Sequence, residues 1–251
     1  MPEAVIEFRD VEYQSSGREV LRQLNLTIHR GEILVLLGRS GSGKTTALKL
    51  VNRLLALSGG EVRVEGRDVR DWNVIELRRH IGYAIQEVGL FPHYTVERNV
   101  GLILSLERLP KEKIHARVQE LLRLVGLSPE ISSRYPNQLS GGQRQRVGVA
   151  RALAADPPML LMDEPFGALD PLTRSDLQRE FLSLQQKLGK TVLFVTHDLH
   201  EALFLGSRIA LLEEGRLVSL GSPEQFLISS DPLVKKYVEA FGSVARVRRD
   251  K

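Results

Sequence analysis

Apolar residues along this chain follow two different spacings, which alternate from segment to segment. The segment through Ile28 alternates apolar and polar residues, which predicts β-strands with one buried face. Ile33–Leu37 is a continuous apolar run, which is typical of a parallel strand buried on both faces. Helical spacing follows over residues 45–57, and a second β-like stretch is expected over residues 61–69.

Helical spacing dominates the middle of the chain. Apolar residues recur three and four positions apart through most of residues 90–156, where a pair of prolines ends the pattern. Strand patterns return at residues 159–162 and Thr191–Thr196, with a helix between them, and a hairpin is expected over residues 209–220. Strands that alternate with helices favour an α/β fold. The helical segment is therefore interpreted as an insertion into an α/β core.

The composition excludes several classes of protein. With 251 residues, 42% hydrophobic and 26% charged, the chain has an ordinary globular composition and can bury a sizeable core. The formal net charge of +4 is too small to indicate nucleic-acid binding, so no nucleic-acid partner is expected. Cysteine is absent, which excludes disulfides, and the longest apolar runs are too short to span a bilayer. A soluble or peripheral chain is expected, with any transport pore in another chain.

Residues 38–45 read GRSGSGKT and match the pattern G-x-x-x-x-G-K-[ST], between a strand pattern and a helical one. The glycines let the backbone curl so that its N–H groups surround phosphate groups, and Lys44 is expected to reach the β- and γ-phosphates. The hydroxyl of Thr45 is suited to Mg²⁺. A plain glycine turn is the alternative interpretation. The residues expected to bind the nucleotide are Gly38, Ser40, Gly41, Ser42, Gly43, Lys44, Thr45 and Thr46.

Two acidic residues follow the apolar strand at residues 159–162. An acid at the carboxyl end of such a strand lies near the phosphate loop, so Asp163 is expected to hold Mg²⁺, directly or through water. Glu164 is the better candidate for polarising the attacking water, because a general base must reach the nucleophile. A strand end flanked by solvated acids is the alternative interpretation.

His197 and Gln86 each follow a strand pattern and carry a side chain suited to the same chemistry. His197 follows Thr191–Thr196, where it would reach a γ-phosphate, although a lone histidine is more often structural. Gln86 follows the strand-like residues 82–85, and its amide is suited to Mg²⁺ or to water. A surface glutamine is the alternative for Gln86.

Residues 139–143 read LSGGQ and place two glycines in the first turn of an expected helix. Each glycine costs a helix about 1 kcal/mol relative to alanine. The capping-box spacing from Ser140 to Gln143 accounts for the serine and the glutamine, but not for Gly141 and Gly142. A glycine pair at a helix N-terminus exposes N–H groups to an anion, which predicts a second anion site in this chain.

Taken in this order, the motifs resemble those of the nucleotide-binding subunit of an ABC transporter. The resemblance extends over almost the whole chain. It implies an α/β fold with a P-loop NTPase core of the RecA-like type, a mainly parallel sheet, an N-terminal antiparallel β subdomain and an inserted helical subdomain. Residues 1–251 would form one ATPase domain, with the core at about residues 1–88 and 158–251 and the helical subdomain at about residues 89–157.

The resemblance also implies a use for the second anion site. Two such domains pair head to tail in this family, and the signature sequence LSGGQ of one chain contacts the ATP bound to the other. The residues that would serve the partner's ATP are Ser140, Gly141, Gly142 and Gln143. Asp170, in the D-loop at residues 168–170, would lie at the same interface. A dimer of identical chains is the simpler expectation.

The family implies ATP and Mg²⁺ as cofactors, with Gln86 as the Q-loop residue and His197 as the H-loop residue. The family usually places an aromatic residue near the N-terminus to stack on adenine. Tyr13 is the candidate in that stretch, with a register open by a residue or two. Arg39 departs from the proline of many importers without disturbing the glycines of the loop or Lys44.

A narrower resemblance concerns the transported solute. Residues 76–100, 146–157 and 162–174 are similar to the ATPases of bacterial importers of glycine betaine, choline, carnitine and related quaternary amines. Many ATPases of that group carry C-terminal CBS domains, which are not expected here because the sequence ends soon after Phe241. An importer of a polyamine, an amino acid or a sulfonate is the alternative.

The resemblance implies partners and a location. They are two membrane permease subunits and, indirectly, a solute-binding protein, at the cytoplasmic face of the bacterial inner membrane. Residues 89–94 would dock the permease subunits through Phe91, Pro92 and Tyr94, although this cluster is alternatively core of the helical segment.

Two other classes of protein are alternatives to a transporter subunit. A non-transport ABC ATPase of translation or DNA repair usually has two such domains, long coiled coils or zinc sites, and zinc would find no cysteine here. A P-loop kinase or GTPase would lack LSGGQ.

Overall fold

The structure of the chain is a computed structural model, which describes residues 3–85, 88–167 and 169–247, with only the backbone for residues 241–247. The chain divides into two compact units. The first unit contains Met1–Trp72 and Thr191–Lys251, and the second contains Asn73–Lys190. Both units combine strands with helices, so the expected α/β fold is confirmed.

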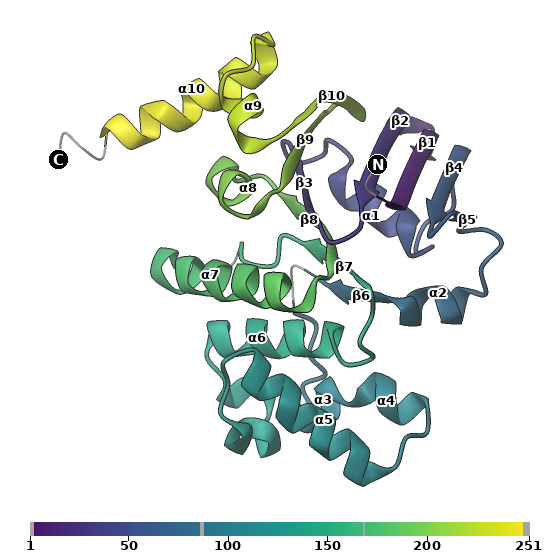
Figure 1. The fold of residues 1–251 in the computed structure, drawn as a ribbon, viewed down its shortest axis with the longest axis vertical. Helices are drawn as coiled ribbons and strands as arrows, with labels where there is room; N and C mark the ends of the chain where they lie inside the picture. Colours follow the sequence, from purple (N-terminus) through teal and green to yellow (C-terminus); the bar gives the residue numbers. More distant parts are fainter. Residues whose placement is uncertain (1–2, 86–87, 168, 248–251) are drawn as a thin grey trace. The chain divides into compact units, whose positions relative to one another are not determined.

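The N-terminal strands of the first unit form an antiparallel sheet with the order β2-β1-β4-β5, drawn in violet and blue in Figure 1. The β-like stretch expected at residues 61–69 is a hairpin, because Glu65 and Gly66 have φ values of 49° and 75° and turn the chain between two strands. The strands are β1 (Ala4–Ser15), β2 (Arg18–His29), β4 (Gly59–Val64) and β5 (Arg67–Asp68).

The other strands of the first unit have the order β10-β9-β3-β8, and β3 is parallel to both of its neighbours. Every residue of β3 and β8 is buried, which confirms the expectation of a central parallel strand at β3. The expected hairpin is confirmed as β9 and β10, joined at Glu214 and Gly215 with φ values of 46° and 79°. The strands are β3 (Ile33–Leu37), β8 (Thr191–Thr196), β9 (Arg208–Glu213) and β10 (Arg216–Gly221).

The helix expected over residues 45–57 is confirmed at its start, but its expected end was wrong because the helix is shorter than its apolar pattern predicted. Helix α1 ends at Val51, and Arg53 adopts a left-handed backbone with φ 53°. The amides of Leu54 and Leu55 then both donate to the carbonyl of Lys49, which closes the helix end. The helices of the first unit are α1 (Lys44–Val51), α8 (Leu199–Leu205), α9 (Pro223–Leu227) and α10 (Pro232–Val247).

The second unit contains a parallel strand pair, β6 (Ile81–Ala84) and β7 (Met159–Asp163), and a group of helices. The helical character expected for residues 90–156 is confirmed. Helix α6 lies at the centre of this group, in contact with α3, α5 and α7 (Figure 1). The helices are α2 (Val74–His80), α3 (Val96–Val100), α4 (Leu102–Leu106), α5 (Lys111–Leu124), α6 (Gly141–Ala152) and α7 (Pro171–Leu188).

Short 3₁₀ helices at Pro129–Ser133 and Pro136–Gln138 join α5 to α6. Across the described part of the chain, no helix has the length and apolar character that a membrane crossing requires.

Candidate functional site

The phosphate loop connects β3 to α1 in the first unit, and its glycines are required by the backbone. Gly41 and Gly43 have φ values of 83° and 103°, a region that side chains with a Cβ rarely adopt. A Cβ on Gly38 would overlap the carbonyl oxygen of Leu212 and lie 2.6 Å from Ser42 Oγ. The loop therefore follows a tight path that only glycine allows at these positions. Its curved backbone forms a cradle in which a phosphate can be held.

Lys44 lies across this cradle. Its side chain is only 4% exposed, and its ammonium donates to the carbonyls of Gly38 and Arg39, each at 2.8 Å. The positive charge is thus fixed over the start of the loop. A buried charge of this kind is stabilised further by an anion placed beside it.

Two observations show that a phosphate fits the loop. Ser42 is 3% exposed, and its buried hydroxyl has no hydrogen-bond partner within the described residues. Helix α1 follows Gly43, which has no side chain to cap the N–H groups of the first turn. A phosphate group supplies the acceptor oxygens that these donors need.

His197 lies beside the phosphate loop in the first unit. Strands β3 and β8 are parallel, with Leu37 opposite Thr196, so Gly38 and His197 follow neighbouring strand ends. The side chains of Arg39 and His197 also line one cavity of about 380 Å³, together with Lys236 of α10. The structure therefore brings His197 to the loop, as the sequence predicted, and adds Lys236, which no sequence pattern indicated.

The placement of Tyr13 stays a prediction. Tyr13 is half-buried on β1, opposite Leu21 of β2. A larger cavity of about 580 Å³ beside the phosphate loop is lined instead by the start of β2, and Tyr13 is not among its lining residues. Arg18 and Arg22 line it together with Glu19, Glu213 and Glu214, and Arg22 pairs with Glu19. Sequence reasoning missed both arginines, because their position beside the loop depends on how β2 packs.

In the second unit, Asp163 ends β7 and is 7% exposed. The phenol of Tyr83, on the neighbouring strand β6, hydrogen-bonds to this carboxylate. Burial, together with the negative charge and hydrogen bond of Asp163, raises the pKa of Tyr83 well above its usual range, so the phenol remains a donor. Sequence reasoning missed Tyr83, although its place on a strand beside the acidic strand end was a usable signal.

Glu164 follows Asp163 with a left-handed backbone, at φ 44°. This conformation turns the chain sharply, and the carbonyl of Glu164 accepts a hydrogen bond from the amide of Gly167 at 3.2 Å. A non-glycine residue held at positive φ is strained, and such strain is found at functional sites. Gln86, predicted beside these acids, lies outside the described residues.

The donors available for a metal ion are few. Within the described ranges, no group of three or more histidine, aspartate or glutamate side chains is arranged to hold a metal ion. Asp163 carries a carboxylate and Thr45 a hydroxyl, and each is an oxygen ligand of the kind that Mg²⁺ accepts beside water and phosphate oxygens. These two residues belong to different units.

The start of α6 has a complete capping box. Ser140 Oγ accepts from the amide of Gln143 at 3.2 Å, and Gln143 Oε1 accepts from the amide of Ser140 at 3.0 Å. A Cβ on Gly142 would lie 2.8 Å from Cγ2 of Thr173, whereas a Cβ on Gly141 would have no neighbour closer than 3.7 Å. Close packing against Thr173 therefore explains the glycine at position 142, and the sequence alone did not indicate this contact. The anion-binding roles of these residues stay predictions.

Thr173 also connects the signature to the D-loop within the second unit. Asp170 caps α7 by accepting from the amide of Thr173 at 3.0 Å, and the Thr173 hydroxyl holds the pKa of Asp170 below its usual value. Arg174 donates to the carbonyls of Phe166, Gly167 and Leu169, which fixes the approach to α7. Ala168 lies outside the described residues.

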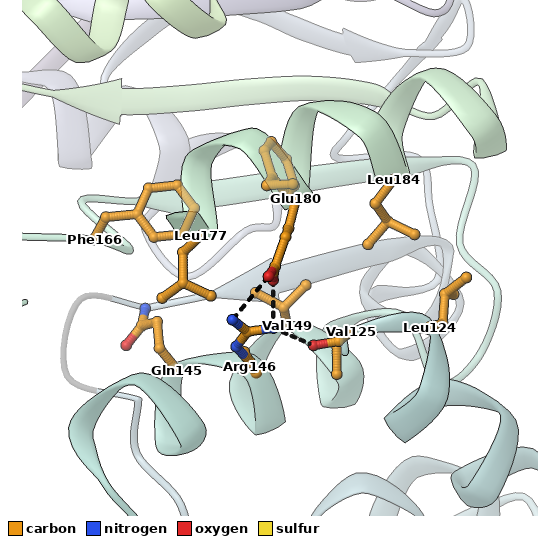
Figure 2. A pocket seen from close by; sticks show the side chains of 10 residues that line it. Leu124, Val125, Gln145, Arg146, Val149, Phe166, Leu177, Glu180 and Leu184 are labelled. Atoms are coloured by element: carbon orange, nitrogen blue, oxygen red, sulfur yellow. Dashed lines mark hydrogen bonds and ion pairs between the residues drawn. The ribbon is translucent and has the colours of Figure 1, made fainter. Parts of the chain in front are cut away.

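A third pocket lies among α5, α6 and α7 (Figure 2). Its walls are apolar, and Arg146 closes it by pairing with Glu180 and donating to the carbonyl of Val125 at 3.0 Å. The cavity measures about 30 Å³, which is close to the volume of one water molecule. It is therefore too small for a nucleotide.

Comparison with known protein families shows which family this sequence matches. The family model described as "ABC transporter" matches residues 21–167. The choline transport ATP-binding protein OpuBA of Bacillus subtilis (strain 168) is 48% identical over 223 residues, which cover 88% of this chain and 58% of that protein. The glycine betaine uptake system ATP-binding protein YehX of Escherichia coli (strain K12) is 49% identical over 87% of this chain and 71% of that protein. This chain thus spans only about 58% of the length of some curated relatives.

Solved structures with the same fold include a dimeric ATP-binding cassette, MJ0796, in a post-hydrolysis state with ADP and Pi. It is 34% identical, covers 87% of this chain and 98% of its own, and has a TM-score of 0.77. The cbiO1 protein of Clostridium perfringens, part of the transporter complex cbiONQ, is 26% identical with a TM-score of 0.83 over 98% of this chain and 99% of its own.

Proposed function

This chain belongs to the ABC transporter family of ATP-binding proteins, and from that premise we propose that it is the ATP-hydrolysing motor subunit of a bacterial importer. The observation that carries the proposal is the phosphate loop. Its glycines form a tight cradle, Lys44 lies across it, and the Ser42 hydroxyl lacks a protein partner within the described residues. His197 lies beside the same loop.

The predicted site residues have separate roles in phosphate binding, proton transfer and metal binding. Lys44 and the loop amides hold the β- and γ-phosphates, and His197 contacts the γ-phosphate. Glu164, which follows Asp163 with a left-handed backbone, takes the proton of the attacking water as general base. Thr45, Asp163 and Gln86 would hold Mg²⁺, which neutralises charge on the phosphates.

We infer that the working form is a head-to-tail dimer of identical chains. The signature residues at the start of α6 would contact ATP held by the partner's phosphate loop, and Asp170 would lie at the same interface. A capped helix start that still exposes Gly141 supports this role, because a backbone amide can approach an anion closely there. The related cassette MJ0796 is dimeric with ADP and Pi bound.

We propose glycine betaine, choline or a related quaternary amine as the solute, because several relatives are named for the transport of these compounds. The ATPase itself does not contact the solute in such a system, so the inference rests on ancestry. Another small polar solute, such as a polyamine, an amino acid or a sulfonate, is the second candidate.

The partners follow from the same premise. Two permease subunits would dock on residues 89–94, and a solute-binding protein would act through them, at the cytoplasmic face of the inner membrane. The division expected from the sequence, with a core at about residues 1–88 and 158–251 and a helical subdomain at about residues 89–157, remains part of this proposal.

The first test concerns hydrolysis. The purified protein is expected to hydrolyse ATP with Mg²⁺, and Glu164→Gln should lower turnover by at least about a hundredfold, the usual contribution of a general base. The variant should also elute as a dimer from gel filtration with ATP, whereas Glu112→Gln on the exposed start of α5 should behave as wild type. A Glu164→Gln protein that stays monomeric with ATP while turning over normally would contradict both the base and the dimer.

The second test concerns the solute. Uptake of labelled glycine betaine is measured after osmotic upshift in cells that lack this gene and other betaine carriers. Wild type is expected to restore uptake, and Lys44→Ala is expected not to restore it. If wild type restores no uptake of betaine or choline, the quaternary-amine assignment fails and polyamines, amino acids and sulfonates are tested next.

A further inference from the structure

We propose that Arg151 is a positioning residue that ties α6, whose start carries the signature sequence, to residues 88–95, which we call the docking segment. The inference rests on the proposed function, because it assigns a route by which ATP at the start of α6 would move the surface that permease subunits contact. All of the residues involved belong to the second unit.

Arg151 holds the beginning of the docking segment by its backbone. Its two terminal nitrogens donate to consecutive carbonyls, to Val88 at 2.5 Å and to Gly89 at 2.8 Å. These residues lie in neither a helix nor a strand, so the guanidinium replaces the hydrogen bonds that regular structure would supply. One planar group that bonds two successive carbonyls fixes both position and orientation.

A second contact on the same helix supports this attachment. Gly148 lies one turn before Arg151 on α6, and a Cβ on Gly148 would lie 2.5 Å from Cγ1 of Val88. The valine side chain therefore packs directly on the helix backbone. The beginning of the docking segment is held by a hydrogen-bonded contact and by a steric one, both from α6.

The rest of the docking segment is held by Asn99 of α3, which is fully buried. Its amide oxygen accepts from the amide of Phe91 at 2.8 Å, and its nitrogen lies 3.1 Å from the carbonyl of Phe91 and 3.0 Å from that of Tyr94. Helix α3 itself packs on α6. The whole segment is thus attached to α6, directly through Arg151 and indirectly through Asn99.

The docking segment carries an exposed aromatic cluster. Phe91 is 41% exposed, its ring centroid lies 5.3 Å from that of Tyr94, and the His93 ring lies 4.5 Å from Tyr94. The guanidinium of Arg98 stacks on Tyr94 at 3.8 Å. Aromatic side chains with one polar edge are enriched at protein interfaces, so this face suits an amphipathic protein partner.

Helix α6 connects the two ends of this route. It runs without interruption from its cap at Ser140 to Arg151, which is eleven residues further on and about 16 Å along the axis at 1.5 Å per residue. A packed helix moves as a rigid body rather than by bending locally. A shift of the signature on ATP binding is therefore passed along α6 to residues 88–95.

The charge of Arg151 makes a purely packing role a poor explanation. Burial lowers the pKa of Arg151, which shows that its surroundings disfavour the charged group. An apolar side chain would fill the same space without that cost. The guanidinium instead donates hydrogen bonds to two loop carbonyls, and an apolar side chain cannot donate such bonds.

The test compares Arg151→Gln with Arg117→Gln in the complete transporter, reconstituted in proteoliposomes with its membrane subunits. Arg117 is the matched control, because its guanidinium also bonds two consecutive carbonyls, those of Leu153 and Ala154, without contacting residues 88–95. We expect solute transported per ATP hydrolysed to fall at least about tenfold in Arg151→Gln, the factor for one lost charge-assisted hydrogen bond. The ratio should stay within about twofold of wild type in Arg117→Gln.

Amide hydrogen exchange provides a readout on the protein alone. Exchange within residues 88–95 should rise at least about tenfold in Arg151→Gln and stay unchanged in Arg117→Gln. If Arg151→Gln does not fold, Arg151→Lys keeps the positive charge but lacks the planar group that bonds both carbonyls, and a fall in the transport ratio is again expected.

The two proposals fail in different ways. A wild-type transporter that shows no ATP-dependent transport would overturn the proposed function, whatever Arg151 does. A wild-type transporter that works, with an unchanged transport ratio in Arg151→Gln or in the substitute Arg151→Lys, would overturn the positioning role alone. Equal losses in Arg151→Gln and Arg117→Gln would also overturn it, because they would indicate general destabilisation.

Discussion

Helices α1 and α6 both begin at glycines, but the two helix starts are stabilised in different ways. The start of α1 has no side-chain cap, and beside it the Ser42 hydroxyl is buried without a partner within the described residues. The start of α6 has a capping box in which Ser140 and Gln143 satisfy each other's amides. The start of α1 therefore suits an anion, whereas the start of α6 is capped by side chains of its own helix.

This difference indicates how the two sites would be used. A helix start without a side-chain cap gains more from an anion, because the anion accepts hydrogen bonds from its N–H groups. A capped start gains less from an anion and would bind one more weakly. Such a start suits contact with a nucleotide that is already bound to another chain. The contrast agrees with a phosphate loop that retains the nucleotide and a signature sequence that closes on the partner's nucleotide.

The largest effect is expected at the uncapped start. Lys44→Ala removes the charge that lies over the loop, and ATP turnover should fall by about a hundredfold or more, as when one donor to a developing anion is lost. Lys49→Ala, in the last turn of the same helix, is the matched control and should retain turnover within about twofold. Turnover of Lys44→Ala close to that of wild type would remove the lysine from the site.

Changing each of the two signature glycines to alanine should have different effects on the free energy of unfolding. Gly142→Ala places a Cβ against Thr173 and should lower the free energy of unfolding by about 1–3 kcal/mol, as overpacking does. Gly141→Ala has room for its Cβ and should leave stability within about 0.5 kcal/mol. Urea denaturation measures both.

A rescue experiment identifies the contact. Thr173→Ser removes the methyl group that Gly142→Ala would overlap, so the double variant should recover most of the lost stability. If the double variant is no more stable than Gly142→Ala, the packing explanation of Gly142 is wrong. Reduced ATP turnover in Gly141→Ala with normal stability would then support an anion contact at Gly141.

A smaller effect is expected from the cap of α6. Ser140→Ala removes one half of the capping box and should cost about 1 kcal/mol of stability, measured by thermal unfolding. Ser140→Asn retains a capping oxygen and should restore most of that loss. An unchanged unfolding midpoint in Ser140→Ala would show that the helix start does not depend on this cap, and the contrast with α1 would disappear.

The smallest effect concerns the pH dependence of the cap of α7. Hydrogen bonds from Thr173 hold the pKa of Asp170 below the unfolded value of about 3.9. The stabilisation from a depressed pKa is complete above the unfolded pKa and is lost as the pH falls through the lower, folded pKa. The difference in unfolding midpoint between wild type and Asp170→Ala should therefore be constant from about pH 5 to 8 and shrink below about pH 4. Asp170→Asn, which caps without titrating, should show no such change relative to Asp170→Ala.

The alternation of strands and helices could be predicted from the sequence, because each pattern is local. Buried strands such as β3 and β8 appear as continuous apolar runs, and the hairpin of β9 and β10 is marked by Glu214 and Gly215. The end of α1 could not be read from periodicity. The apolar pattern continues past Val51, but the left-handed Arg53 and the amides that close on Lys49 end the helix there.

The sequence by itself determined the chemical groups of this protein, since the phosphate loop, the two acids at the end of β7 and the signature are runs of neighbouring residues. Their spacing along the chain decides what they can do locally, so residues such as Lys44 and Glu164 could be named in advance. Only the tertiary structure decided that Tyr83 bonds Asp163, that Thr173 packs where Gly142 has no side chain, and that Arg151 holds Val88 and Gly89. Each of these contacts joins residues far apart in the chain, and their approach is determined by the packing of whole helices and strands rather than by any local pattern.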